Sequence, residues 1–198
     1  AMRYIGGTYV YQIPEIGKGG AISRMSMQVV GSSAFWMGHR GFYIYDGTVR
    51  RLNSEVGDFV FKDMNRTQAS KIWCENRSQF SEVTWHYPSA KSEECDRYVT
   101  FNHALGIWYF GEMERTGGGD QGILEHPLAV DANGIVYQHE MGSTYIDSDG
   151  VALTPYAISG PIELGQGDQI MIIDDIYPDE QTLGALKFNL YTSDNATD

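Results

Sequence analysis

The chain contains five histidines, which raises the question of a metal site. His139-Glu140 resembles the start of a zinc-protease helix signature, in which a second histidine follows three residues after the glutamate. That position holds Ser143, and the adjacent Gly142 disfavours a helix. The other histidines stand singly along the chain, at His39, His86, His103 and His126. We therefore predict isolated, hydrogen-bonded histidines, no metal site and no cofactor.

Two acidic segments offer paired carboxylates. Asp147-Ser-Asp-Gly150 resembles the first half of a calcium loop, but Tyr156 stands where the bidentate glutamate is needed. Asp174-Asp175 and Asp179-Glu180 have the residue types that glycoside hydrolysis uses as general acid and base. They bracket Pro178, which is typical of an exposed turn between strands. We predict surface turns at both segments.

Sequence motifs for nucleophilic catalysis and for phosphate binding are absent from the chain. It has no G-x-S-x-G, no G-x-G-x-x-G and no phosphate loop. Cys74 and Cys95 lie in neither a glycine-rich nor a basic setting, so no lowered thiol pKa is expected. The sequence thus predicts no catalytic residues, and we expect a protein that is not an enzyme.

Composition and charge narrow the class of protein. With 198 residues, 42% hydrophobic and 13% aromatic, the chain is expected to fold as a globular domain. Its apolar runs reach only four residues, which excludes a transmembrane helix. Fourteen basic against 26 acidic residues give a net charge of −12, and Arg50-Arg51 is the best basic cluster, so tight nucleic-acid binding is not expected. The first ten residues lack the pattern of a signal peptide, and Ala1-Met2 resembles a cloning remnant.

The elements that must position these residues are short strands. Val, Ile, Tyr, Phe and Trp recur in segments of three to six residues separated by Gly, Asp, Asn or Pro, with turns at Gly47, Asp131–Gly134 and Asp147–Gly150. A weak helix is possible over Val60–Trp73. The predicted strands are Met25–Val30, Phe42–Tyr45, Val49–Leu52, Phe59–Phe61, Val83–Tyr87, Tyr98–Phe101, Ile107–Phe110, Ile135–Tyr137 and Ile170–Ile173. We predict a mainly β fold of antiparallel hairpins.

Strand pairs recur at a loose period. Apolar strands begin near Phe35, Val83, Leu128 and Ile170, in steps of about 48, 45 and 42 residues, which is the range of propeller blades. We expect a β-propeller-like arrangement, and an irregular β-sandwich is the alternative. The expected organisation is an N-terminal segment (1–21), one β-rich domain (22–191) and a C-terminal tail (192–198), with a long loop over Glu114–Gly122 that contains Gly117–Gly119.

Aromatic residues are the most distinctive feature of the composition. Aromatic side chains on hairpins can form platforms on which sugars stack, so a glycan-binding or glycan-cleaving module is an alternative function. The favoured interpretation is that they fill the core and the interfaces of a β protein. The set comprises Trp36, Tyr43, Tyr45, Trp85, Tyr87, Tyr98, Trp108, Tyr109 and Tyr137.

An ordered series of motifs between Ile22 and Tyr191 resembles the tail-accessory, packaged-DNA-stabilisation proteins of short-tailed bacteriophages and prophages. The resemblance depends on the order and spacing of the motifs together. They are Phe35-Trp-Met-Gly38, Gly41-Phe-Tyr-Ile-Tyr-Asp-Gly47, Glu82-Val-Thr-Trp-His-Tyr-Pro-Ser89, Asp96-Arg-Tyr-Val-Thr-Phe-Asn102, Trp108 with Gly111, Arg115-Thr116, His126-Pro127, Tyr137-Gln-His-Glu-Met-Gly142, and Ile173 with Pro178-Asp179 and Gly184.

The resemblance implies a structural protein of the virion that is made and assembled in the host cytoplasm. Relatives form a ring in the tail channel, so the expected partners are other tail or connector proteins and further copies of the chain. Cys74 and Cys95 are then expected to be free thiols, because that compartment is reducing. Acidic segments are candidates for the lining of a DNA channel: Asp147–Gly150, Asp174–Glu180 and Glu93-Glu94.

The motif residues have expected packing roles. Tyr45-Asp46-Gly47 is predicted to form a hairpin turn in which Asp46 accepts local N–H groups. Glu82 and Arg97, on candidate neighbouring strands, are predicted to form a cross-strand ion pair. Trp85 and Trp108 are the expected anchors of the core.

Overall fold

The computed structural model describes residues 2–141, 156–160, 172–175, 177 and 187–191. The chain divides into two units, residues 1–143 and 144–198, and all described helices and strands belong to the first unit. Strands make up 37% of the structure and helices 10%, so the predicted mainly β class is confirmed. Among the described residues, no helix is both long and apolar enough to span a membrane.

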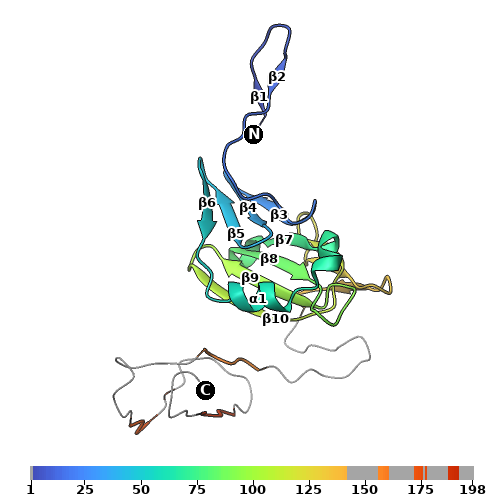
Figure 1. Ribbon diagram of the computed structural model, residues 1–198. Coiled ribbons are helices and arrows are strands. Elements are labelled where there is room, and N and C mark those ends of the chain that lie inside the picture. The colour runs from blue at the N-terminus through green and yellow to red at the C-terminus, as the bar shows by residue number, and fades with distance from the viewer. Residues whose placement is uncertain (1, 142–155, 161–171, 176, 178–186, 192–198) are drawn as a thin grey trace. The chain divides into compact units, whose positions relative to one another are not determined.

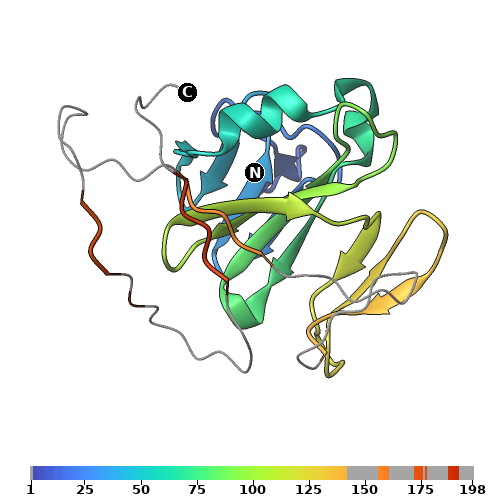
Figure 2. The same ribbon diagram turned by 90° about the horizontal axis from the view of Figure 1, so that it is seen from below.

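Three antiparallel meanders follow one another along the chain, each with its strands in sequence order (Figures 1 and 2). The first comprises β3 (Met27–Val30), β4 (Ser33–Met37), β5 (Phe42–Tyr45) and β6 (Val49–Leu52). The second comprises β7 (Trp73–Arg77), β8 (Glu82–Tyr87), β9 (Arg97–Asn102) and β10 (Ile107–Glu112). The third has three strands, β11 (Gly117–Gly119), β12 (Leu128–Val130) and β13 (Val136–Gln138).

The first strands of successive meanders lie side by side. β3 contacts β7, β7 contacts β11, and a parallel bridge joins Met25 to Trp73. An N-terminal hairpin of β1 (Arg3–Tyr4) and β2 (Tyr11–Gln12) precedes the meanders. None of the sheets closes into a barrel.

The hydrophobic core lies between the first and second meanders. Alternation along each strand sends Phe35, Phe42 and Ile44 from one sheet, and Val83, Trp85 and Val99 from the other, into this layer. The Trp85 indole N–H donates to the carbonyl of Ser26 over 3.0 Å and so ties the two meanders together. Trp85 is fully buried in this core, as predicted. Trp108, the other predicted anchor, is half-buried at the margin of the core, and its indole N–H donates to the carbonyl of Asn53.

Helix α1 (Gly57–Asp63) corrects the prediction of a strand over Phe59–Phe61. Val56, Val60 and Met64 are spaced four apart, so one helical face packs on the core. Asp58 in the first turn and Lys62 in the last turn interact favourably with the helix dipole. The helix predicted over Val60–Trp73 is correspondingly split, because α1 ends at Asp63 and the 3₁₀-helix η1 (Arg66–Lys71) leads into β7. A second 3₁₀-helix, η2 (Ser78–Phe80), joins β7 to β8.

The prediction of an ion pair between Glu82 and Arg97 is wrong. The antiparallel register places Glu82 opposite Asn102 and Arg97 opposite Tyr87, at opposite ends of the strand pair. Arg97 instead lies 3.1 Å from the Asp63 carboxylate and 2.8 Å from that of Glu112.

The predicted turns at Gly47 and Asp131–Gly134 are present, whereas Asp174 and Asp175, predicted to lie in a turn, are exposed and form none. Gly47 adopts a φ of +114° between β5 and β6, and the Asp46 carboxylate lies 2.7 Å from Arg50. The Asp131 carboxylate accepts the backbone N–H groups of Asn133 and Ile135 over 2.9 Å each. Asp147–Gly150, Asp179 and Glu180 lie outside the described residues.

Some strand predictions are wrong. Gly117–Gly119, predicted as a loop, forms β11, and β7 was not predicted. Ile172 and Ile173 are exposed and belong to no strand, and the rest of the predicted Ile170–Ile173 strand lies outside the described residues.

Candidate functional site

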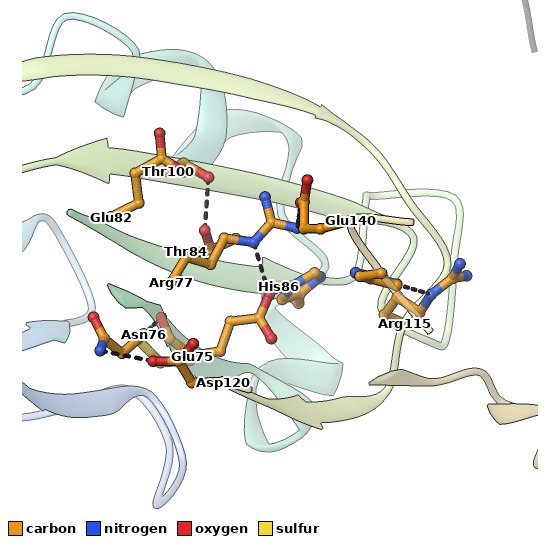
Figure 3. Close-up of polar contacts among 12 residues, drawn as sticks. Glu75, Asn76, Arg77, Glu82, Thr84, His86, Thr100, Arg115, Asp120 and Glu140 are labelled. Atoms are coloured by element: carbon orange, nitrogen blue, oxygen red, sulfur yellow. Dashed lines mark hydrogen bonds and ion pairs between the residues drawn. The ribbon is translucent and has the colours of Figure 1, made fainter. Parts of the chain in front are cut away.

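The second meander has a polar face opposite its core face, and this polar face is also buried. In the register of the sheet, Glu75 lies opposite Thr84, which lies opposite Thr100, and the two threonine hydroxyls are 2.8 Å apart. We call the charged and histidine groups on and against this face the buried polar network (Figure 3): Glu75, Arg77, His86, Arg115, His139 and Glu140.

Glu75 is the anion at the centre of the network. Its Oε1 lies 3.3 Å from Nε2 of His86 and 3.4 Å from Nε of Arg77. Burial raises the pKa of Glu75, but the hydrogen bond from His86 and the nearby positive charge outweigh it, so the pKa lies below its ordinary value. Glu75 is therefore ionised at neutral pH. Arg77 extends the chain of charges, with Nη2 at 3.7 Å from Oε1 of Glu140.

His86 is neutral and held in one orientation. Its ring stacks on Trp73 with centroids 4.2 Å apart and planes 4° apart. Complete burial lowers the pKa of His86 by more than the neighbouring Glu75 raises it. The Nε2–H group therefore donates to the Glu75 carboxylate.

Arg115 and His139 bring the third meander onto this face. Nε of Arg115 donates to Nε2 of His139 over 3.0 Å, and the guanidinium carbon lies 3.7 Å from the centre of the Tyr137 ring. The indole N–H of Trp73 donates to the Arg115 carbonyl over 3.0 Å. Burial and the positive charge of Arg115 lower the pKa of His139 to about 4, so this histidine is also neutral.

The residue types of the network are those of acid–base catalysis, but their setting is structural. Glu75, His86 and Arg115 are only 6%, 1% and 5% exposed, which leaves too little surface for a substrate to reach them. Glu75 contacts His86 and Arg77 within the second meander, and the links toward the third meander are those from Trp73 to the Arg115 carbonyl and from Arg77 to Glu140. The arrangement therefore fixes the third meander to the second through satisfied buried charges.

The histidines are less isolated than the sequence suggests. His86 and His139 belong to one network, whereas His39 is exposed and His103 stacks on Phe35 with centroids 5.8 Å apart. Across residues 2–141 and the other described segments, no three His, Cys, Asp or Glu side chains gather as a metal site would require.

Both cysteines are free and buried. Burial raises the pKa of the Cys74 thiol well above its ordinary value and that of Cys95 to about 12. Both thiols stay protonated at neutral pH, so neither is a nucleophile there.

Sequence reasoning did not identify Glu75 and Arg77 as site residues and singled out Arg115 only as part of a motif. The signal was the alternation in Trp73-Cys-Glu-Asn-Arg77, which places residues 73, 75 and 77 on one face of a strand. Glu75 and Arg77 interrupt the apolar pattern of this segment, and a buried strand face is expected to be apolar, so the segment was not predicted as a strand.

The aromatic set does not form an open platform. All nine of its members are buried or half-buried. Trp36 stacks on Tyr43 with centroids 5.6 Å apart, and Phe42 packs on both Trp85 and Trp108. These contacts favour the packing interpretation over sugar stacking.

A scan of the chain against models of known protein families finds no match, and no curated protein matches it either.

The lowered pKa of His139 predicts an acid-sensitive fold. An unfolded histidine titrates near 6.5, so the contribution of neutral His139 to stability is complete above about pH 6.5 and is lost as the pH falls toward 4. Allowing for solvent screening, we expect a loss on the order of 1–2 kcal/mol over this range. Urea unfolding at a series of pH values measures it.

The matched variants are His139→Gln, which removes the titration, and His39→Gln, which changes an exposed histidine. We expect a shallower pH dependence for the first and an unchanged one for the second. Equal slopes for His139→Gln and the unaltered chain would contradict the role of this histidine.

Proposed function

We propose that the chain is a structural component of a bacteriophage tail or head–tail connector. It assembles through contacts with other tail proteins and with further copies of itself, resides in the virion, and helps to retain or conduct packaged DNA. The observation that carries the proposal is the amount of apolar surface left uncovered on an otherwise well-ordered β unit.

Three groups of uncovered apolar side chains lie on the unit, and further ones lie on helix α1, η2 and the second meander: Phe59, Phe80, Leu105, Ile107 and Phe110. On the N-terminal hairpin they include Tyr4, Ile5 and Tyr9; on and next to β3 they are Met25, Met27 and Val29. On the third meander and its connections they are Ile123, Leu124, Leu128, Ile135, Val136 and Met141. Surfaces of this kind mark protein–protein contacts.

The succession of meanders supports a propeller-like arrangement as part of the same proposal. Propeller blades are four-stranded meanders arranged around an axis, with their first strands innermost. The first strands β3, β7 and β11 neighbour one another in that order, and they start 46 and 44 residues apart. Two complete blades and a third with three strands would form an arc, which further chain or partner subunits would extend.

The alternative function, glycan binding or cleavage, has less support. The aromatic set is packed inside, and the charged groups of the buried polar network are enclosed. Asp174 and Asp175 are exposed and remain the carboxylates that this alternative would use.

A screen of the purified chain against bacterial surface polysaccharides, with detection of new reducing ends, separates the two functions. We expect neither binding nor turnover. Saturable binding or product release would favour the glycan function, and its loss in an Asp174→Asn, Asp175→Asn variant would locate the site.

The charge distribution predicts that the chain does not bind double-stranded DNA. The net charge is −12, and in the most basic cluster Arg50 is paired with the Asp46 carboxylate, which reduces the positive charge that this cluster offers to phosphates. We expect no gel shift at about 50 mM salt, where electrostatic binding is strong. A shift that weakens steeply with added salt would contradict the proposal and point to a basic face around Arg50, Arg51, Lys62 and Arg66.

A further inference from the structure

The N-terminal hairpin and the segment that follows it, residues 3–16, form an apolar arm. Its seven large apolar side chains are 43–79% exposed. A two-stranded hairpin is marginally stable alone, and here the β1–β2 pairing spans two residue pairs. The side chains concerned are Tyr4, Ile5, Tyr9, Val10, Tyr11, Ile13 and Ile16.

A second uncovered apolar surface lies at the first strand of the first meander. Met25, Met27 and Val29 are 51–66% exposed and alternate along the strand, so they form one row on one face. Met25 also lines a groove of about 620 Å³, together with Ile22, Ser23, Arg24 and Ser70. We call the row and this groove the β3 surface. It is concave at one end and apolar along its length.

The path of the chain carries the arm away from the β3 surface of its own copy. Ile22 donates its N–H to the carbonyl of Met37 in β4, and Gly19 packs on the Tyr43 ring in β5. Gly17 packs on Val49 in β6, where a Cβ atom would come within 2.5 Å of the valine Cβ. Read toward the N-terminus, the chain therefore crosses the sheet from β4 to β6 and leaves it at the edge opposite β3.

We infer that the arm of one copy of this chain docks on the β3 surface of a second copy. The inference rests on the proposed assembly role and names the two surfaces that serve it. The arm exposes roughly 600 Å² of apolar side chain, approaching the about 800 Å² per partner of a standard interface. An arm that meets a different surface on the next copy makes a heterologous contact, and such contacts generate rings when the rotation between copies closes.

Two variants test the inference in the full chain by native mass spectrometry and light scattering at tens of micromolar. The arm variant is Ile5→Asp with Tyr9→Asp, and the surface variant is Met27→Lys with Val29→Lys. Matched controls change apolar side chains elsewhere that are at least as exposed: Tyr156→Asp (82% exposed) and Leu105→Lys (70% exposed). Circular dichroism checks that each variant keeps its fold.

We expect assemblies larger than a monomer for the unaltered chain and both controls, and monomers for each variant alone. An equal mixture of the two variants is expected to form a two-chain species, because one intact arm meets one intact β3 surface. A monomeric unaltered chain, or a mixture that stays monomeric, would overturn the inference. Unchanged assembly of both variants would also overturn it but would leave the assembly role standing, whereas glycan turnover would remove that role.

Discussion

Replacing Trp85 with alanine is expected to lower the free energy of unfolding by about 4 kcal/mol. Trp85 is fully buried, its ring packs on Phe42 with centroids 5.0 Å apart, and its N–H donates to the Ser26 carbonyl. The substitution leaves a cavity between the first and second meanders and removes one of the two hydrogen bonds that the Ser26 carbonyl accepts, the other coming from the N–H of Met37. Urea unfolding followed by circular dichroism measures the loss.

Two control variants separate the effect of the cavity on the free energy of unfolding from the effects of the lost hydrogen bond and of losing a large apolar side chain at the surface. Trp85→Phe keeps an aromatic ring but loses the hydrogen bond, and we expect a loss of about 1–2 kcal/mol. Leu105→Ala changes an exposed apolar side chain outside the arm and the β3 surface and is expected to change stability by less than about 0.5 kcal/mol. A loss below about 1 kcal/mol for Trp85→Ala would show that the two meanders do not share this core.

Replacing Glu75 with alanine is the second change with a large expected effect, a loss of about 3 kcal/mol. Removing this carboxylate leaves Arg77 without its nearest anion and the His86 N–H without an acceptor, both largely out of water. Glu75→Gln keeps an acceptor for His86 and is expected to lose less stability. The same urea unfolding at neutral pH measures both variants.

A surface ion pair offers the matched control. Glu94 lies 2.5 Å from Lys71, and both side chains are partly exposed, at 46% and 36%, so Glu94→Ala is expected to cost less than about 1 kcal/mol. If Glu75→Ala were no more destabilising than Glu94→Ala, Glu75 would not be the anion that stabilises the buried polar network.

The hairpins could be predicted from sequence because their signals are local. Phe42–Tyr45 and Val49–Leu52 flank Asp46-Gly47, and the positive φ of Gly47 is what that turn requires. The repeat of strand pairs is equally local, since each meander pairs its strands in sequence order.

Phe59–Phe61 was predicted as a strand because three consecutive residues cannot show the four-residue spacing of Val56, Val60 and Met64.

The buried polar network could not be predicted, because its members meet only in three dimensions. Glu75 and Arg115 lie 40 residues apart in sequence and belong to different meanders. The error over Glu82 and Arg97 has a similar origin. The register of β8 and β9 depends on the nine-residue connection from Pro88 to Asp96, and a shift of pairing changes which side chains meet.

The proposed virion role is tested most directly by quantitative mass spectrometry of phage particles purified from cells that carry the gene for this chain. We predict that the chain is present in intact tails at a fixed copy number relative to the other tail proteins, as a ring component would be. Complete, infectious particles that lack the chain would contradict the proposal that it is a structural part of the virion.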